Sequence, residues 1–288
     1  MSLAGSLEEF FAAQMEAWPL LRDGIDSLGR MRKRRLPTRW FEVEARHLPH
    51  RMASATAKVD PESVKSRPCF LCSANLPPEE RGLPFDREFS LYCNPFPILD
   101  RHVTIVHRDH RPQQIEGYVG TMLDIAAALP GYFVLYNGAE CGASAPDHLH
   151  FQAALRNVFP IGRPDARTDG LAIRLEDLDR QRLLDRLNRL LVGLRRITGR
   201  QPEPLINVAI CWEEGKWRAF VFPRGKHRPE SFYSGDFTLS PGSIDLCGIL
   251  VVSVESDFEK LRAEDVTAVF EEVTLPSKQF RELAALDV

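Results

Sequence analysis

The segment His148-Leu-His-Phe-Gln152 places two imidazoles and an amide at alternate positions of the chain. On a β-strand, alternate side chains project to the same face, so His148, His150 and Gln152 would share one side while Leu149 and Phe151 face the other. Alternate residues of a strand lie about 6.6–6.8 Å apart, so one histidine can hold a metal while the next addresses a substrate. By spacing alone, the histidine pair also fits a surface or core strand without a chemical role.

Cys69 and Cys72 have the separation with which two thiolates grip one tetrahedral ion. Zinc would need two further nitrogen or sulfur ligands, and the sequence contains no second pair of cysteines at this spacing. Histidines must then supply the rest. The segment 102–110 contains three histidines, and the last of them, His110, combines with His148 in a chemically reasonable Cys2His2 site. The alternative is that the four residues are unrelated.

The elements that would position these residues predict an α+β fold. In the first half we expect strands at Phe89–Asn94, His102–His107, Tyr132–Tyr136 and His148–Ala154, and helices at Ser6–Gly29 and Gln113–Leu129. In the second half we expect a long helix at Leu175–Thr198, strands at Leu205–Trp212, Trp217–Phe222 and Cys247–Val252, and helices at Ala263–Val273 and Ser277–Leu286. A loop at residues 162–170 separates the halves. We therefore predict units at 1–165 and 166–288, or one compact domain that contains both.

The composition of the 288 residues disfavours several classes of protein. The chain has 37 Lys and Arg against 40 Asp and Glu, and this net charge of −3 argues against a surface that tracks nucleic-acid phosphates. The basic run Arg30–Arg35 lacks the aromatic residues of single-strand binders and is interpreted as a solvated segment. No apolar run reaches the roughly 18–20 residues that cross a bilayer. With no secretory pattern at the start and no disulfide framework, we expect a cytoplasmic protein.

Three separated motifs, in the right order, resemble the galactose-1-phosphate uridylyltransferase branch of the histidine-triad (HIT) superfamily. They are Cys69-Phe-Leu-Cys-Ser-Ala-Asn75, Asp109-His110 and Gly142-Ala-Ser-Ala-Pro-Asp-His-Leu-His-Phe-Gln152. This resemblance covers residues 65–155 and implies a HIT-like fold of two HIT-type halves, with antiparallel sheet and flanking helices. The first half would carry a zinc ion and the nucleophile, and the second would complete the nucleotide site.

One residue departs from the uridylyltransferase pattern. Asp147 stands between Pro146 and His148, where those enzymes have histidine directly after proline. Whether this insertion alters the zinc site is left open by the sequence. The string that follows is instead similar to the GDP-hexose phosphorylases, which cleave GDP-L-galactose or GDP-D-glucose with phosphate. Three further segments resemble that family: 94–106, 221–229 and 239–248. Segment 94–106 also resembles the dinucleoside tetraphosphate phosphorylases.

The resemblance implies a role for each residue of the last motif. His150 would be the nucleophile that attacks the α-phosphorus of a nucleoside diphosphate compound and forms a nucleotidyl-imidazole. A neutral imidazole suits this step at pH 7, because its unperturbed pKa of about 6.5 leaves a lone pair available. Gln152 would donate to a non-bridging phosphoryl oxygen. His148 would hold a structural zinc with Cys69, Cys72 and His110, while its backbone carbonyl fixes the tautomer of His150.

Substrate contacts are expected from an NH-lined turn, from two asparagines and from a basic strand end. The turn around Ser144 favours anions, and the basic side chains would neutralise a pyrophosphate or an incoming phosphate. For these residues a plain turn, capping or solvated-loop role is the alternative. The expected substrate-binding set is Asn94, Asn137, Gly142, Ala143, Ser144, Arg224, Lys226 and Arg228.

The expected activity is phosphorolysis of a GDP-hexose to GDP and hexose 1-phosphate through a covalent nucleotidyl-histidine. The first alternative keeps the same histidine chemistry, as a hexose-1-phosphate uridylyltransferase or a dinucleoside tetraphosphate phosphorylase. A nonenzymatic nucleotide-binding regulator and a zinc-dependent nucleic-acid binder are the others. The expected partners are a nucleoside diphosphate sugar or dinucleotide, with inorganic phosphate or a sugar phosphate as acceptor, and neither membrane nor nucleic acid. The oligomeric state stays open, with a homodimer among the alternatives.

Overall fold

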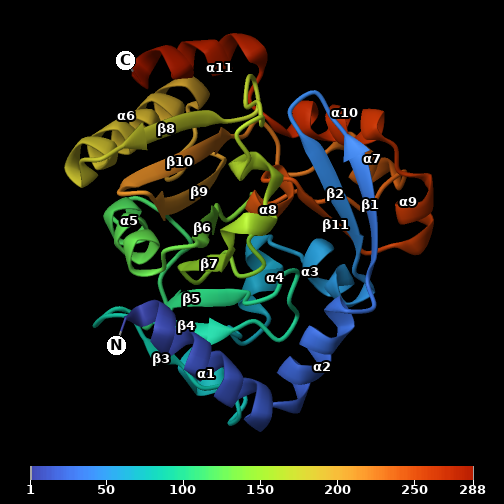
Figure 1. The fold of residues 1–288 in the computed structure, drawn as a ribbon. Coiled ribbons are helices and arrows are strands. Elements are labelled where there is room, and N and C mark those ends of the chain that lie inside the picture. Colours follow the sequence, from blue (N-terminus) through green and yellow to red (C-terminus); the bar gives the residue numbers. More distant parts are fainter. Residues whose placement is uncertain (1, 288) are drawn as a thin grey trace.

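The computed structural model describes residues 2–287, and an antiparallel sheet of eight strands runs through its centre (Figure 1). The strand order is β3-β4-β5-β7-β6-β9-β10-β8. Strands from the two halves of the chain meet where β6 pairs with β9 and Leu135 lies opposite Ala209. The division at residue 165 stays a proposal, because both halves contribute to one continuous sheet. The bounds are β3 (Leu83–Pro84), β4 (Phe89–Cys93), β5 (Val103–His107), β6 (Tyr132–Asn137), β7 (His150–Leu155), β8 (Ile173–Asp177), β9 (Ile206–Glu213) and β10 (Lys216–Pro223).

Helices cover one face of this sheet. Their apolar side chains and those of the sheet form one hydrophobic core, in which Phe11, Leu123, Leu187 and Phe280 are buried with Phe151 of β7. Burial of these large side chains supplies the main driving force for folding this layer. The helices that contribute to this core include α1 (Leu3–Ala17), α2 (Pro19–Leu28), α5 (Val119–Ala128), α6 (Arg180–Thr198) and α11 (Ser277–Ala284).

A second, three-stranded sheet covers the opposite face and forms the other core (Figure 1). In it β1 (Arg32–Pro37) is antiparallel to β2 (Glu42–His47), which pairs in parallel with β11 (Ile249–Val252). Short helices lie next to this second sheet and between the two sheets, where the candidate site described below is located. The bounds of η1 and of the remaining α-helices are η1 (Pro49–Arg51), α3 (Met52–Ala55), α4 (Pro61–Lys65), α7 (Glu230–Ser234), α8 (Ser243–Leu246), α9 (Glu255–Lys260) and α10 (Ala263–Val273).

The predicted α+β class, with antiparallel sheet and flanking helices, is confirmed. Several predicted helices have different bounds, and the one predicted at Gln113–Leu129 begins only at Val119. The opening helix is interrupted at Trp18, because the residue before Pro19 takes an extended conformation (φ −120°, ψ 100°). The helix predicted from Leu175 begins at Arg180, since the preceding residues form β8 and the Asp179 carboxylate caps the helix by accepting the N–H of Arg182 at 2.9 Å.

The basic run Arg30–Arg35, expected as a solvated segment, forms the mostly exposed strand β1 from Arg32 onward. Its position at the edge of the small sheet leaves the cationic side chains in reach of carboxylates. Arg32 pairs with Glu255 at 2.9 Å, and Arg35 with Glu42 at 3.6 Å. Such charges on an edge strand also discourage pairing with another chain. No helix among residues 2–287 is both long and apolar enough to cross a membrane.

Candidate active site

Four potential metal ligands converge beside the start of β7. Cys69 and Cys72 lie in the segment between α4 and β3, His110 follows β5, and His148 precedes β7. Their ligand atoms all lie within 4.8 Å of one another. The Sγ of Cys69 is 3.3 Å from Nδ1 of His148, and the Sγ of Cys72 is 3.2 Å from Nδ1 of His110. Two sulfurs and two imidazole nitrogens at this spacing fit one tetrahedral ion, so the cluster could hold a metal.

The outer atoms of the two imidazoles support the same interpretation. Nε2 of His148 lies 2.6 Å from the carbonyl oxygen of His107, so this nitrogen donates and Nδ1 presents its lone pair to the cluster. Nε2 of His110 lies 3.8 Å from Oδ2 of Asp147, whose carboxylate is also 3.1 Å from the Arg67 guanidinium. The inserted Asp147 therefore stands behind His110 and leaves His148 within the cluster. Carboxylates and carbonyls in these positions orient metal-binding histidines.

The main chain holds His150 in one tautomer. Its Nδ1 lies 2.8 Å from the carbonyl oxygen of His148, so Nδ1 carries the proton and Nε2 has the free lone pair. The His150 N–H donates to Oε1 of Gln113 at 2.8 Å, while the Gln113 amide donates to the carbonyls of His150 and Asn137. His150 is only 4% exposed, and burial lowers its pKa to about 4. The arrangement leaves a neutral, oriented imidazole at pH 7, as the predicted nucleophilic role would require.

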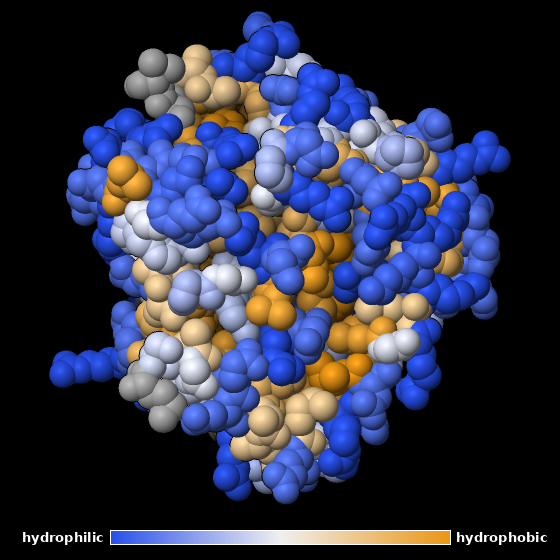
Figure 2. Space-filling model, in the orientation of Figure 1, coloured by the Kyte–Doolittle hydropathy of each residue, from blue (hydrophilic) through white to orange (hydrophobic). Residues whose placement is uncertain are grey.

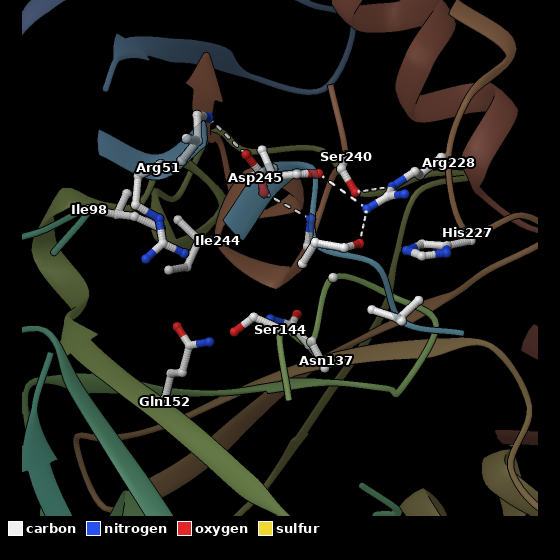
Figure 3. Close-up of a pocket in the computed structure, with 17 residues that line it drawn as sticks. Arg51, Ile98, Asn137, Ser144, Gln152, His227, Arg228, Ser240, Ile244 and Asp245 are labelled. Atoms are coloured by element: carbon white, nitrogen blue, oxygen red, sulfur yellow. Dashed lines mark hydrogen bonds between the residues drawn. The ribbon is translucent and has the colours of Figure 1, made fainter. Parts of the chain in front are cut away.

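A cavity opens between β7 and the small sheet, on the face that carries Gln152 (Figure 3). On the surface drawn in Figure 2, apolar side chains reach a hollow near α3 and are surrounded by hydrophilic ones. Gly142 lines the cavity at φ +94°, where an added Cβ would lie 2.9 Å from Cα of Gly242, so only glycine fits this turn. The lining includes Arg51, Ile98, Asn137, Gly142, Ala143, Ser144, Gln152, His227, Arg228, Ser240, Gly242, Ile244 and Asp245.

Six of the predicted site residues line this cavity: Asn137, Gly142, Ala143, Ser144, Gln152 and Arg228. Asn137 accepts the N–H of Ser243 at 2.7 Å, which ties the turn to α8. Arg228 packs over Phe232 and donates to the carbonyls of Ala55 and Ala57, which leaves it at the wall of the cavity. His150 is not part of the lining, but it precedes Gln152 on the same face of β7.

Three predicted substrate-binding residues lie outside the cavity, and we leave them out of the proposed site. Asn94 accepts the N–H of Phe96 at 2.9 Å and so forms a turn. Lys226 is 52% exposed and pairs with Glu272 at 2.6 Å. Arg224 is 1% exposed, and its guanidinium donates to Asn207 and to four main-chain carbonyls, at Val273, Pro241, Lys226 and His227. Those contacts use every N–H of the guanidinium, so none is available to a phosphate.

Sequence reasoning missed several residues of the cavity. Arg51 ends η1 and points into the cavity from the side opposite Gln152 (Figure 3). Burial lowers the pKa of its guanidinium to about 10, so it is still a cation at neutral pH. Asp245 of α8 accepts the N–H groups of Gly242 and Val251, each at 2.8 Å, and burial raises its pKa to about 6. Only the resemblance of residues 239–248 could have pointed to Asp245, and no sequence signal marked Arg51.

Comparison with known proteins places two parts of the chain in described families. Residues 10–155, about half of the chain, match the family described as domain of unknown function (DUF4922). Residues 202–286 match the description GDPGP1-like, C-terminal domain. No curated protein matches the sequence. The second match bears out the resemblance to the GDP-hexose phosphorylase and uridylyltransferase branch.

Crystal structures of yeast Ap4A phosphorylase Apa2 share the fold over nearly the whole chain. One structure is 18% identical, with a TM-score of 0.56, and the match covers 89% of this chain and 94% of that one. The complex with AMP is 18% identical, with a TM-score of 0.58 and coverage of 94% and 97%. The complex with Ap4A is 16% identical, with a TM-score of 0.60 and coverage of 94% and 98%. The HIT-like fold class is therefore confirmed.

Proposed function

We propose that this chain, which belongs to the family described as domain of unknown function DUF4922, is a nucleotidyltransferase that acts through a covalent nucleotidyl group on Nε2 of His150. The observation that carries the proposal is the 2.8 Å contact between Nδ1 of His150 and the His148 carbonyl. This contact leaves the lone pair of Nε2 free, on a buried ring beside Gln152. Since Nδ1 keeps its proton, the ring needs no separate general base to become a nucleophile.

The reaction balances without a proton transfer to the protein. Nε2 of His150 attacks the α-phosphorus of a nucleoside diphosphate compound, a P–N bond forms, and the bond from that phosphorus to the bridging oxygen breaks. The ring is then a cation, and the His148 carbonyl stabilises the charge through Nδ1–H. An inorganic phosphate oxygen next attacks the same phosphorus, and the P–N bond breaks to restore the neutral ring. Ping-pong kinetics follow from this two-step exchange.

Groups around the cavity would hold the phosphates during both steps. The Gln152 amide and the turn at Ser144 line the floor of the cavity, and Arg51 and Arg228 bring a guanidinium to opposite sides of it (Figure 3). Guanidinium groups form charge-assisted hydrogen bonds to phosphate oxygens, and amide donors stabilise the charge that develops on non-bridging oxygens. Nε and Nη2 of Arg228 already donate to Ser240, Ala55 and Ala57, so Nη1 is the group that would meet a phosphate. This chemistry suits a substrate with at least two linked phosphates.

We propose a GDP-hexose as the donor. In the first step His150 takes its GMP group and hexose 1-phosphate leaves, and in the second step phosphate takes the GMP group and GDP is released. The match of residues 202–286 to a GDPGP1-like C-terminal domain and the similarity of residues 148–153 to the GDP-hexose phosphorylases support this choice. A dinucleoside tetraphosphate is the second candidate, because the structure that shares the fold over 94% of this chain is a phosphorylase in complex with Ap4A. In that case the histidine would carry AMP.

Zinc is the proposed metal of the Cys2His2 cluster. When bound, it would hold the His148 imidazole and thereby fix the main chain that orients His150. Cys69, Cys72, His110 and His148 would be its ligands. We give it a structural role, because two cysteines and two histidines would complete a tetrahedral coordination and leave no position open for a water or a substrate.

The test is the intact-protein mass after brief incubation without acid and without acceptor. GDP-glucose, UDP-glucose and diadenosine tetraphosphate are supplied separately, and His150→Ala is the control. A GMP adduct that is absent from the variant supports the GDP-hexose donor, whereas UMP or AMP retains the chemistry and replaces the substrate. If no donor gives an adduct and phosphate yields no product, the nucleotidyltransferase proposal is wrong.

A further inference from the structure

His102 contacts Gln152, whose amide is the proposed hydrogen-bond donor to the phosphoryl group, and His102 is itself fully buried. It immediately precedes β5, which pairs with β7 so that Thr104 lies opposite Gln152. Nε2 of His102 lies 2.8 Å from Oε1 of Gln152, and Nδ1 lies 3.3 Å from the main-chain nitrogen of Ile98. The imidazole therefore joins a main-chain turn to a side chain of the cavity.

The hydrogen bonds of this ring can run in one direction only. A main-chain N–H always donates, so Nδ1 of His102 must accept from Ile98 and cannot carry a proton. The neutral ring then carries its proton on Nε2 and donates it to the Gln152 oxygen. The amide nitrogen of Gln152 is left on the cavity side, toward Ser144 (Figure 3).

The turn that sets this direction is held by cationic and imidazole side chains. Three successive carbonyl oxygens of the turn accept hydrogen bonds: that of Phe96 from Arg51 at 2.9 Å, that of Pro97 from His50 at 3.1 Å, and that of Ile98 from Arg46 at 2.9 Å. These contacts fix the peptide planes of the turn. They therefore also fix the direction of the Ile98 N–H, which donates its hydrogen bond to Nδ1 of His102.

We propose that His102 is a positioning residue that holds the Gln152 amide with its NH2 group toward the transferring phosphoryl group. The inference rests on the proposed function and adds a residue to it. Without the imidazole, the amide can rotate and present its oxygen to the anionic phosphoryl oxygens, which replaces attraction by repulsion. Loss of one oriented donor of this kind costs about 100–1,000-fold in rate, so partial loss of orientation should cost about 10–100-fold.

The kinetic test compares a substitution that removes the ring N–H with one that retains an N–H donor. His102→Phe removes the donor, whereas His102→Gln places an N–H near the position of Nε2. With the donor that gives the adduct, we expect kcat to fall about 10–100-fold in His102→Phe, with KM changed less than threefold, and to recover at least tenfold in His102→Gln. In a Gln152→Ala background, His102→Phe should cost less than threefold. An equal cost in both backgrounds, or no recovery with glutamine, would overturn the positioning role.

A measurement without substrate separates this inference from the proposed function. Long-range 15N–1H NMR spectra of the wild-type protein report which ring nitrogen of His102 carries the proton, with His102→Gln used to assign the signal. We expect the proton on Nε2, and a proton on Nδ1 overturns the inference even in an active enzyme. If the wild type gives the expected tautomer but no adduct with any donor, the proposed function fails and the positioning role fails with it.

Discussion

The carbonyl oxygen of His148 lies 2.8 Å from Nδ1 of His150, so a single residue joins the metal-ligand cluster to the proposed nucleophile. The side chain of His148 belongs to the cluster, while its main chain sets the tautomer of His150. Displacement of the side chain therefore moves the carbonyl as well. This coupling makes metal content, stability and reactivity of His150 depend on one another.

Removal of the metal should lower both stability and adduct formation. We expect about one zinc per chain in the purified protein, and a fall in Tm of at least about 5 °C after chelation, because each kcal/mol lost shifts Tm by about 2–4 °C in a chain of this size. Cys69→Ser should reproduce both effects. The measurements are elemental analysis by mass spectrometry and thermal unfolding, with Cys211→Ala, a buried thiol of β9, as control. Full zinc occupancy in Cys69→Ser would remove this residue from the ligand set.

Asp147 should raise the affinity of the cluster for metal. Its carboxylate stands 3.8 Å from Nε2 of His110 and 3.1 Å from Arg67, so it favours the ring orientation in which Nδ1 faces the cysteines. Asp147→Asn should weaken metal binding by about tenfold, at the lower end of the range for residues that orient metal ligands. Competition with a coloured chelator measures the affinity. Asp100→Asn, at a surface ion pair with Arg101, is the control, and equal affinities of the two variants would contradict this role.

The sequence predicted the local part of the site and missed the part assembled from distant segments. The alternation around His150 and Gln152 indicated their shared face, because side-chain direction in a strand depends only on spacing. For the cysteine pair, residue types alone left a Cys2His2 site and four unrelated residues as alternatives, since His110 follows β5 and His148 precedes β7, far apart in the sequence. Arg51 carried no signal, because η1 reaches the cavity only after the small sheet packs on the large one.

The charge pattern of the predicted basic strand end did not indicate which contacts its cations make. Arg224 and Lys226 have the residue types and spacing of a phosphate site, yet one is used inside the protein by carbonyls and the other by Glu272. A sequence does not show which hydrogen-bond acceptors the fold places around a cation. The start of the long helix was predicted too early for a simpler reason. The apolar residues near Leu175 belong to β8, a strand in which alternate residues are buried.

Arg51 should contribute to substrate binding, and Lys226 should not. The guanidinium of Arg51 lines the cavity, so Arg51→Met should raise KM for the nucleotide donor about 10–100-fold, the cost of losing a hydrogen bond to a charged group. Lys226→Met removes a cation outside the cavity and should leave KM within twofold. Steady-state kinetics with the donor identified by the mass experiment measure both values. A larger effect in Lys226→Met would return the predicted basic strand end to the site.

Glu203 should make the stability of the fold depend on pH. Its carboxyl group accepts the O–H of Tyr136 at 2.7 Å and the N–H of Ile115 at 2.6 Å, and burial raises its pKa from 4.5 to about 7. A carboxyl group with a higher pKa in the folded state binds its proton more tightly when folded. The free energy of unfolding therefore falls as the pH rises from about 4.5 to about 7, and this contribution is constant above that range.

Glu203→Gln should remove this contribution, because the amide does not titrate. The difference in unfolding free energy, variant minus wild type, should increase by up to about 3 kcal/mol between pH 4.5 and pH 7, since one pKa unit corresponds to about 1.4 kcal/mol. Urea unfolding at several pH values measures it. Glu9→Gln, at an exposed position on α1, is the control. A constant difference for Glu203→Gln would show that the buried carboxyl group titrates in the folded protein as it does in the unfolded chain.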